Sequence, residues 1–210
     1  MKVLVISDVH SGFRYLEKIL RAASNEGITK SFACGDITHF KPLDILKFDR
    51  FMSEYGIECI AVHGNCDPPA TLELFEQTEV ELIHGRSALF GEFTLHGVGG
   101  SSYTPFFTPS EYSEEEIKGF VKNFDYGTKN ILISHCPPYG ILDRTYSNVN
   151  AGCRAIREIL DNFDAILCGH IHEARGKVES KGLIINPGPA NAGYFAILDL
   201  NSFSVEMRKV

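Results

Sequence analysis

Short apolar runs recur along this chain, and several of them end directly before a side chain that can bind a metal ion. The run at residues 3–6 has the length and apolar character of a buried strand. It is followed by a segment with apolar residues at helical spacing on one face, and strand-like and helix-like segments keep alternating through the first half of the chain. This alternation, together with β-rich parts later in the chain, predicts a single α/β domain with two sheets between helices.

Side chains of metal-binding type follow five of these runs. They are Asp8 and His10 after residues 3–6, Asp36 after residues 32–34, Asn65 after residues 60–62, His135 after residues 131–134, and His170 and His172 after residues 166–168. If strand geometry continues past residue 6, the i, i+2 spacing points Asp8 and His10 the same way. The carboxyl ends of neighbouring parallel strands line one crevice, so all seven side chains should converge if these strands are parallel neighbours.

Each of these residues alone has a simpler structural explanation. Asp8 or Asp36 could cap the N-terminus of a helix after a strand–helix turn. Asn65 could adopt the left-handed conformation of a Gly-Asn turn, and His135 or His170 could be a hydrogen-bonded structural histidine. Independent capping needs rarely place seven such residues at five strand ends, so the whole set favours a metal site.

Five sequence blocks, in their order along the chain, resemble the calcineurin-like metallophosphoesterase superfamily. The blocks are Asp8-x-His10, Gly35-Asp36, Gly64-Asn65-Cys66-Asp67, Ser134-His135 and Gly169-His170-Ile171-His172. The resemblance covers nearly the whole chain and implies a four-layer αββα sandwich with two mixed β-sheets, in a single domain over residues 1–210. It also implies a dinuclear site with Asp36 as the bridging ligand. One ion would be held by Asp8, His10, Asp36 and His172, and the other by Asp36, Asn65, His135 and His170.

The mixture of ligand types is informative about the metal. Carboxylate, imidazole and amide ligands together suit Mn²⁺, Fe, Zn²⁺ or Ni²⁺, whereas an oxygen cage for Mg²⁺ or Ca²⁺ would not use four histidines. We favour Mn²⁺. Two divalent ions against two Asp carboxylates leave a local charge of about +2, which attracts phosphate. Such a pair of ions can activate a bridging water for attack on phosphorus, so hydrolysis needs no covalent enzyme intermediate.

Cys66 departs from the pattern of the superfamily. Its third block usually reads Gly-Asn-His followed by an acid, and that His is thought to protonate the leaving group. A thiol with a pKa near 8.5 is a poorer acid at neutral pH than an imidazolium near 6.5, and general acid catalysis is worth about 10² to 10⁴ in rate. We therefore expect weak monoesterase activity and favour diesters, since some bacterial phosphodiesterases of the superfamily carry the same Gly-Asn-Cys-Asp block.

Three residues are candidates for direct roles in catalysis. His39 could reach the cleft and supply the proton in place of Cys66, although it could equally be a surface-loop histidine. Asp67, the acid of the third block, is the remaining candidate beside Cys66 and His39.

The rest of the chain predicts strands of a different kind. Residues 81–83, 87–90 and 93–95 are expected to be antiparallel strands, and the runs at 183–185, 194–198 and 204–207 are expected to form β-hairpins. Residues 97–109 are rich in Gly, Ser, Thr, Pro and aromatics, which predicts a loop over a surface cleft. Its aromatic residues Tyr103, Phe106 and Phe107 could stack on a nucleobase, or they could pack against the protein.

The charge balance excludes some classes of partner. The 210 residues carry 20 Lys+Arg and 27 Asp+Glu, a net charge of −7 with no basic run. This argues against tight non-specific binding to nucleic acid or to anionic lipid.

The longest apolar run, residues 194–198, is far shorter than the roughly 18 residues of a membrane span. Six cysteines without a Cys-x-x-Cys pair indicate reduced thiols and a cytoplasmic location. The β-rich tail offers an edge for a homodimer.

We therefore expect a dinuclear metal-dependent phosphodiesterase that acts on a small, nucleotide-like phosphodiester. The alternative is a metal-binding protein-interaction scaffold of the same fold with weak catalysis. A nicotinamide-binding Rossmann domain is excluded, because the first strand is followed by Asp-Val-His-Ser-Gly and not by Gly-x-Gly-x-x-Gly.

Overall fold

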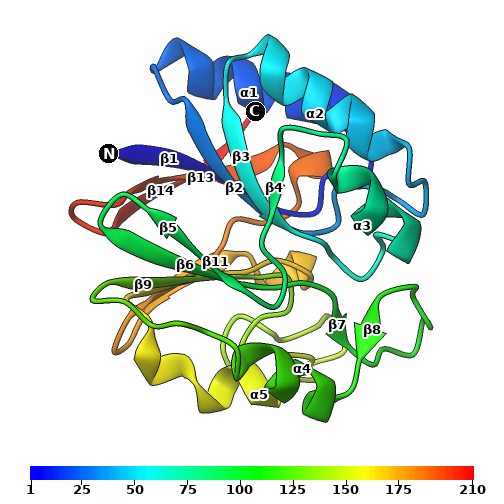
Figure 1. The fold of residues 1–210 in the computed structure, drawn as a ribbon, viewed down its shortest axis with the longest axis vertical. Coiled ribbons are helices and arrows are strands. Elements are labelled where there is room, and N and C mark those ends of the chain that lie inside the picture. Colours follow the sequence, from blue (N-terminus) through cyan, green and yellow to red (C-terminus); the bar gives the residue numbers. More distant parts are fainter.

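Two six-stranded sheets lie face to face, with helices on their outer faces (Figure 1). The computed structural model describes all 210 residues. The strand order is β14-β13-β1-β2-β3-β4 in the first sheet and β11-β12-β10-β9-β6-β5 in the second. Helices α1 and α2 cover the first sheet and helices α4 and α5 cover the second. These layers confirm the predicted αββα sandwich with two mixed sheets.

The elements have the following bounds. The first sheet contains β1 (Lys2–Ile6), β2 (Lys30–Cys34), β3 (Glu58–Val62), β4 (Glu81–Leu82), β13 (Tyr194–Asp199) and β14 (Ser204–Lys209). The second contains β5 (Ser87–Phe90), β6 (Phe93–Val98), β9 (Asn130–Ser134), β10 (Ala165–Leu167), β11 (Gly176–Glu179) and β12 (Leu183–Asn186), and a separate pair is formed by β7 (Ser101–Ser102) and β8 (Glu111–Tyr112). The helices are α1 (Phe13–Asn25), α2 (Asp44–Glu54), α3 (Pro69–Phe75), α4 (Glu114–Val121) and α5 (Arg154–Glu158), with 3-10 turns η1 (Leu160–Asn162), η2 (His172–Ala174) and η3 (Ala190–Ala192). None of these helices has the length and apolar character needed to cross a membrane.

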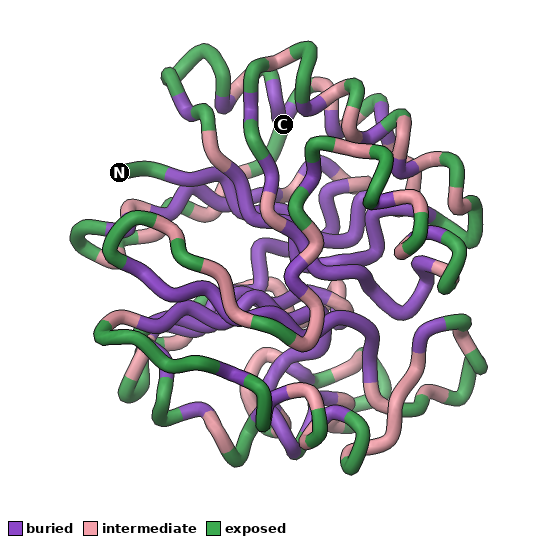
Figure 2. Tube along the Cα trace, in the orientation of Figure 1, coloured by how far each residue is buried: buried purple, intermediate pink, exposed green.

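The central strands bury both of their faces. In β1, Val3 and Val5 point into the core between the sheets, while Leu4 and Ile6 point into the core beneath α1 and α2. Burial on both sides explains why these strands read as continuous apolar runs without alternation. Figure 2 shows the buried residues running through both sheets. Each such side chain contributes about 1.5–3 kcal/mol when it leaves water.

Parallel pairing brings the important strand ends to one edge. Strand β2 pairs in parallel with both β1 and β3, and β9 pairs in parallel with β10. Within each sheet, the strands that precede the candidate ligands therefore end at a common edge, and the 3.5 Å contact between Asp36 Oδ2 and His135 Nε2 brings the two edges together. This is the crevice position that the sequence predicts.

Some predicted pairings are corrected. Strand β4 pairs in parallel with β3, so the prediction of an antiparallel strand at residues 81–83 is wrong. Strand β12 lies between β10, to which it is parallel, and β11, to which it is antiparallel. The sequence did not reveal β11, because its alternating exposed Lys177 and Glu179 are typical of an edge strand and give no apolar run. The antiparallel pairs β5/β6 and β13/β14 are confirmed.

Candidate metal centre

The turns after the strands are held in an unusual backbone conformation. Asp8, Asp36 and His170 have φ of 56°, 51° and 65°, and His10 has φ of 44°. Left-handed conformations are uncommon for residues other than Gly and cluster at functional sites. Strand geometry therefore does not continue past residue 6, and that part of the prediction is wrong. The turn itself aims the side chains, and it is fixed by hydrogen bonds from the Asp8 amide to the Gly35 carbonyl (3.0 Å) and from the His10 amide to the Asp36 carbonyl (2.8 Å).

Four side chains form the first cluster of candidate ligands. His172 Nε2 lies 3.3 Å from Asp8 Oδ1, His10 Nε2 lies 3.5 Å from Asp36 Oδ2, and the two Nε2 atoms of His10 and His172 lie 3.4 Å apart. Two ligand atoms that each sit about 2.1 Å from one ion are themselves roughly 3.0–3.5 Å apart. Asp8 Oδ1 is also buried without a hydrogen-bond partner. A buried carboxylate oxygen in this position suits a cation.

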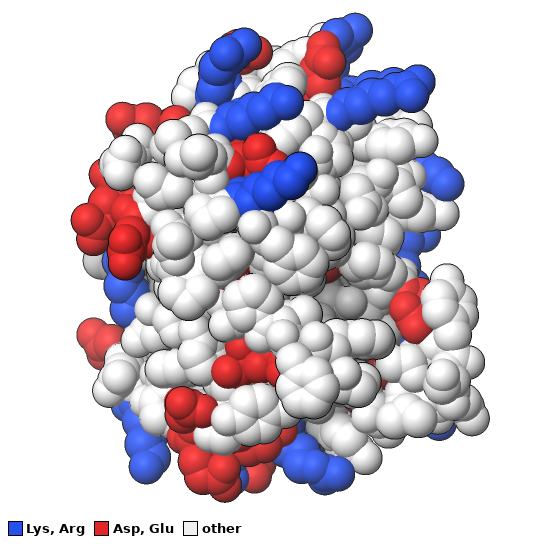
Figure 3. All heavy atoms as spheres, turned by 90° about the vertical axis from the view of Figure 1, so that its right-hand side faces the viewer, with Lys and Arg blue, Asp and Glu red and all other residues white.

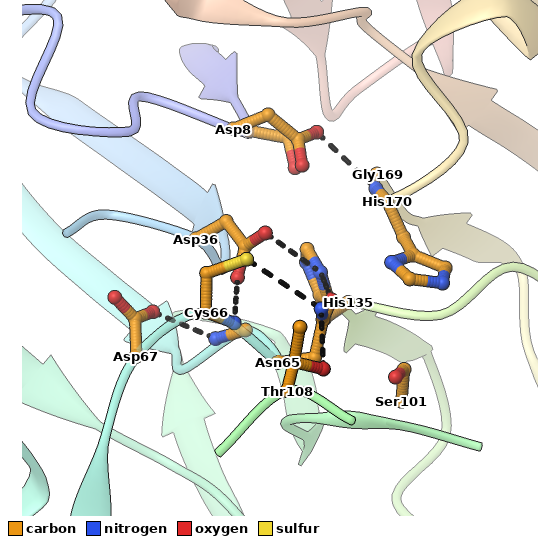
Figure 4. A network of polar contacts seen from close by, with 12 residues as sticks. Asp8, Asp36, Asn65, Cys66, Asp67, Ser101, Thr108, His135, Gly169 and His170 are labelled. Atoms are coloured by element: carbon orange, nitrogen blue, oxygen red, sulfur yellow. Dashed lines mark hydrogen bonds and ion pairs between the residues drawn. The ribbon is translucent and has the colours of Figure 1, made fainter. Parts of the chain in front are cut away.

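A second cluster shares Asp36 with the first. Figure 4 shows Asp36, Asn65 and His135 pointing toward one another, with His135 Nε2 at 2.8 Å from Asn65 Oδ1 and 3.5 Å from Asp36 Oδ2. The other ring nitrogen, Nδ1, donates to the Cys34 carbonyl at 2.7 Å, which leaves Nε2 with a lone pair. Three acceptor atoms then face one another, so a cation or an extra proton must lie between them.

The electrostatics of this cluster agree with that geometry. Burial alone would lower the pKa of His135, but the charges of Asp36 and Asp8 outweigh burial and raise this pKa to about 9. Burial would likewise raise the pKa of Asp36, yet His135 and His10 hold it well below its usual range. The carboxylates thus stay ionised and demand positive charge, which a divalent ion would supply in place of the proton.

His170 takes a position beside the second cluster. Its ring centroid lies 5.0 Å from that of His135, and its backbone amide donates to Asp8 Oδ2 at 3.2 Å. Burial lowers the pKa of His170 to about 4, so the imidazole is neutral at pH 7 and has a free lone pair. The structure thus gathers all seven predicted side chains at one crevice. His170 is absent from the three groups whose candidate ligand atoms lie within 4.8 Å of one another, which are Asp8, His10 and His172, then Asp8, Asp36 and His135, and then His10, His39 and Cys66.

His39 and Cys66 border the first cluster. His39 Nδ1 lies 3.3 Å from His10 Nδ1, so one N–H joins the two rings and directs the opposite nitrogen of His10, Nε2, at the carboxylates. The Cys66 thiol lies within 4.8 Å of both rings. Burial raises the pKa of Cys66 above its usual value, and the side chain is only 8% exposed.

Asp67 lies behind the site. Its carboxylate accepts hydrogen bonds from the Thr38 amide (2.7 Å), the Thr38 hydroxyl (2.8 Å), the Gly64 amide (2.7 Å) and the Ile37 amide (3.2 Å). Figure 4 places it on the far side of Cys66 from His135. The side chain therefore ties the turn after β2 to the turn after β3, which is the work of a positioning residue and differs from the direct role expected from the sequence.

The predicted loop at residues 97–109 approaches the site through Thr108. The Asn65 Nδ2 group donates to Thr108 Oγ1 at 2.9 Å. The loop aromatics do not pack against the protein, since Tyr103, Phe106 and Phe107 are 70%, 80% and 89% exposed. Sequence reasoning missed Thr108 and its partner Glu111, although the Thr-x-x-Glu pattern at 108–111 is a local signal for side-chain hydrogen bonding.

A cavity of about 620 Å³ is lined in part by Glu173, Ala174 and Arg175, which directly follow the candidate ligand His172 in the sequence. Its lining includes Arg144, Tyr146, Glu173 and Arg175. The Nε of Arg175 donates to the Pro187 carbonyl at 3.1 Å and its guanidinium stacks 4.7 Å above the Tyr194 ring, so the group is held in place. Figure 3 shows the side of the molecule that lies to the right in Figure 1, where the Lys and Arg side chains gather mainly toward the end that carries α1 and α2 and form no continuous basic surface.

Comparison with known proteins gives consistent matches. The model of the calcineurin-like phosphoesterase superfamily domain matches residues 1–202. An uncharacterized protein of Methanocaldococcus jannaschii, MJ1162, is 34% identical over 205 residues, covering 90% of this chain and 88% of that protein. The crystal structure of TT1561 from Thermus thermophilus superposes with a TM-score of 0.77 at 18% identity, over 99% of this chain and 98% of that one. A structure described as a novel archaeal phosphodiesterase superposes with a TM-score of 0.57 at 16% identity over 100% of both chains.

Proposed function

The chain belongs to the calcineurin-like phosphoesterase superfamily, and from this premise we propose that it is a dinuclear phosphodiesterase acting on a small, nucleotide-like phosphodiester. Members of this superfamily depend on divalent metal ions, and the structure supplies candidate ligand groups. The observation that carries the proposal is the position of Asp36. Its Oδ2 lies 3.5 Å from His10 Nε2 in one cluster and 3.5 Å from His135 Nε2 in the other.

The proposed ligand sets follow the two clusters. Asp8, His10, Asp36 and His172 would hold one ion, and Asp36, Asn65, His135 and His170 would hold the other. When bound, two divalent ions, with Mn²⁺ favoured, lower the pKa of water and neutralise charge on phosphate oxygens. The mixed nitrogen and oxygen donors suit Mn²⁺, Fe, Zn²⁺ or Ni²⁺.

Residues next to the candidate ligands hold their side chains in the orientation that metal binding requires. The Cys34 carbonyl fixes the tautomer of His135, and the contact between the Nδ1 atoms of His39 and His10 holds the His10 ring with Nε2 toward the Asp36 carboxylate. Outer partners of this kind hold a ligand ring in one orientation and increase its basicity. Asp67 holds together the two turns that present Asp36 and Asn65.

The preference for diesters rests on Cys66. Its thiol stays protonated and is a weak acid, so it assists poorly in the departure of a basic leaving group. His39 adjoins both Cys66 and His10, and it is the one imidazole of that group outside the proposed ligand set. We propose that His39 partly substitutes for the missing histidine and donates a proton to the leaving group, less effectively than a histidine at position 66 would. A His39→Ala variant should then lose more activity on an alkyl ester than on a nitrophenyl ester, because nitrophenolate leaves without a proton.

We place one ester substituent of the substrate in the cavity that Glu173 and Arg175 line. The immobilised guanidinium of Arg175 offers N–H donors there, and a charge-assisted hydrogen bond contributes about 1.5–3 kcal/mol to binding. A substrate with a second anionic or hydrogen-bond-accepting group would use it.

The decisive experiment compares hydrolysis of an aryl phosphodiester and its monoester by chelator-stripped protein. Mn²⁺, Ni²⁺ or Zn²⁺ is added back, bound metal is counted by elemental analysis, and Asp36→Asn serves as the control. Metal-dependent diester turnover that disappears in Asp36→Asn supports the proposal. Two bound ions without turnover would contradict the proposed enzymatic activity and favour a metal-binding interaction scaffold. A protein that binds no metal would contradict both the enzyme and the metal-binding scaffold.

A further inference from the structure

We propose that Thr108 and Glu111 are positioning residues that fix which way the Asn65 amide faces. The inference rests on the proposed function, because it concerns the amide oxygen that Asn65 would offer to the second ion. It goes beyond that function by assigning a role to the loop between β7 and β8, which supplies none of the proposed ligands.

The first step concerns the two ends of the Asn65 side chain. Oδ1 lies 2.8 Å from His135 Nε2, inside the second cluster, while Nδ2 donates to Thr108 Oγ1 at 2.9 Å outside it. A primary amide presents an acceptor at one end and two donors at the other, and rotation by half a turn exchanges them. In the rotated state two N–H groups would face the ion position, and the residue could not act as a ligand.

The second step concerns the single proton of the Thr108 hydroxyl. This O–H donates to Glu111 Oε1, so only lone pairs remain for Asn65. Glu111 is itself held by the Thr104 amide (3.0 Å), the Thr104 hydroxyl and the Thr108 amide (2.9 Å). Burial would raise the pKa of Glu111, but these hydrogen bonds hold it below its usual value, and the carboxylate is therefore only an acceptor.

The direction of the whole chain of hydrogen bonds follows from that charge. An ionised Glu111 accepts from Thr108, Thr108 must then accept from Asn65, and Asn65 must turn its oxygen inward. The other neighbour of Nδ2 is the Cys66 sulfur at 3.5 Å, a weak acceptor that does not replace a hydroxyl. Outer partners of metal ligands are typically worth about 10- to 100-fold in metal affinity.

The loop contains its own control residue. Thr104 donates its hydroxyl to the same Glu111 oxygen, but it does not touch Asn65. Removing the Thr104 hydroxyl takes one hydrogen bond from Glu111, but the Thr104 and Thr108 amides and the Thr108 hydroxyl still hold that carboxylate. The contact of Thr108 with Asn65 also remains. Removing the Thr108 hydroxyl disturbs the loop and also removes the partner of the Asn65 amide. Valine has nearly the shape of threonine, so both substitutions preserve volume.

The test measures Mn²⁺ binding by equilibrium dialysis in the full chain and in Thr108→Val, Thr108→Ser and Thr104→Val. Thermal unfolding of each metal-free variant checks that it folds. We expect two ions in the unmodified protein, and in Thr108→Val one of the two should bind about 10- to 100-fold more weakly while the other changes by less than about twofold. Thr108→Ser, which keeps the hydroxyl, should restore the affinity, and Thr104→Val should leave both ions unchanged.

Three results would overturn the inference. Thr108→Val could bind both ions as tightly as the unmodified protein, Thr104→Val could weaken binding as much as Thr108→Val, or Thr108→Ser could fail to restore it. Failure of the underlying function has a different signature, because the unmodified protein would then bind no pair of ions at all.

Discussion

The carboxylate of Asp36 lies directly against the backbone of Gly64, with no space between them for a side chain. A Cβ built on Gly64 would lie 2.0 Å from Asp36 Oδ1 and 2.2 Å from the Asp36 amide nitrogen. This approach lets the turns after β2 and β3 pack closely enough for Asp36 and Asn65 to face one cluster.

Gly64→Ala should therefore abolish the site. The added methyl group must displace Asp36 or the backbone, so we expect loss of tightly bound Mn²⁺ and a fall of at least about 2 kcal/mol in the free energy of unfolding. Gly119→Ala is the control, because its Cβ would meet nothing within 4 Å on α4 and should stabilise the protein by about 0.5–1 kcal/mol. Urea denaturation and elemental analysis measure both effects. Normal metal content in Gly64→Ala would contradict the close packing.

Metal removal should lower the thermal stability. Asp8, Asp36 and four imidazoles form a concentrated set of acceptors that metal ions would satisfy. With Mn²⁺ at 100 times its dissociation constant, each site adds about 2.7 kcal/mol, which corresponds to a rise of roughly 5–11 °C in Tm for a chain of this size. Differential scanning fluorimetry of the protein after chelation and again after Mn²⁺ is added back measures this change in Tm. Asp36→Asn should show a much smaller rise, and an equal rise in that variant would argue against Asp36 as a shared ligand.

Cys66→His should change the dependence on the leaving group. An imidazolium with a pKa near 6.5 donates a proton more readily at pH 7 than a thiol near 8.5, and general acid catalysis contributes about 10² to 10⁴. We expect turnover of an alkyl phosphomonoester to rise at least tenfold, with little change for bis-nitrophenyl phosphate. The measurement is the steady-state turnover of both substrates by the variant and by the unmodified protein. An equal rise on both would indicate altered metal binding instead of acid catalysis.

His84 should make stability depend on pH. Its Nδ1 accepts from the Gly99 amide at 2.9 Å, its ring packs against Phe120, and burial lowers its pKa from 6.5 to about 4. Between those values the unfolded chain binds more protons than the folded one, so the contribution of His84 is complete above pH 6.5 and is lost as pH falls toward 4.

The comparison uses His84→Asn, which keeps an acceptor but does not titrate. Between pH 7 and pH 5 the unmodified protein should lose more free energy of unfolding than the variant, by about 1–2 kcal/mol. Urea titrations at the two pH values measure the difference. Equal losses would mean that His84 is protonated in the folded state.

Arg175→Ala should weaken substrate binding without stopping the reaction. Loss of a fixed guanidinium at the cavity should raise KM for an anionic diester about tenfold and leave kcat nearly unchanged. Lys177→Ala, two residues further along on an exposed position of β11, is the control and should change neither constant. A fall in kcat with unchanged KM would place Arg175 at the reacting phosphate instead.

The sequence predicted the strand ends because their signal is local. Asp8, Asp36 and His135 each follow an apolar run in strands that are buried on both faces, and parallel pairing then brings them together. Strand β4 has only two residues, and β11 is a half-exposed edge strand. Neither segment has an apolar pattern long enough to predict which strand it pairs with. The contact between Asn65 and Thr108 joins residues 43 positions apart, and only the packing of the loop creates it.

The place of β1 in the first sheet has a consequence for biosynthesis. β1 is flanked on one side by β2 and on the other by β13, and residues 190 and 191 donate backbone hydrogen bonds to the Ser7 and Asp8 carbonyls. The turn that carries Asp8 therefore lacks its support until residues 190–199 have left the ribosome. A nascent chain would expose most of the candidate ligands but could not yet arrange them. Metal binding would then have to await synthesis of β13, and a chain cut before residue 190 should not bind metal tightly.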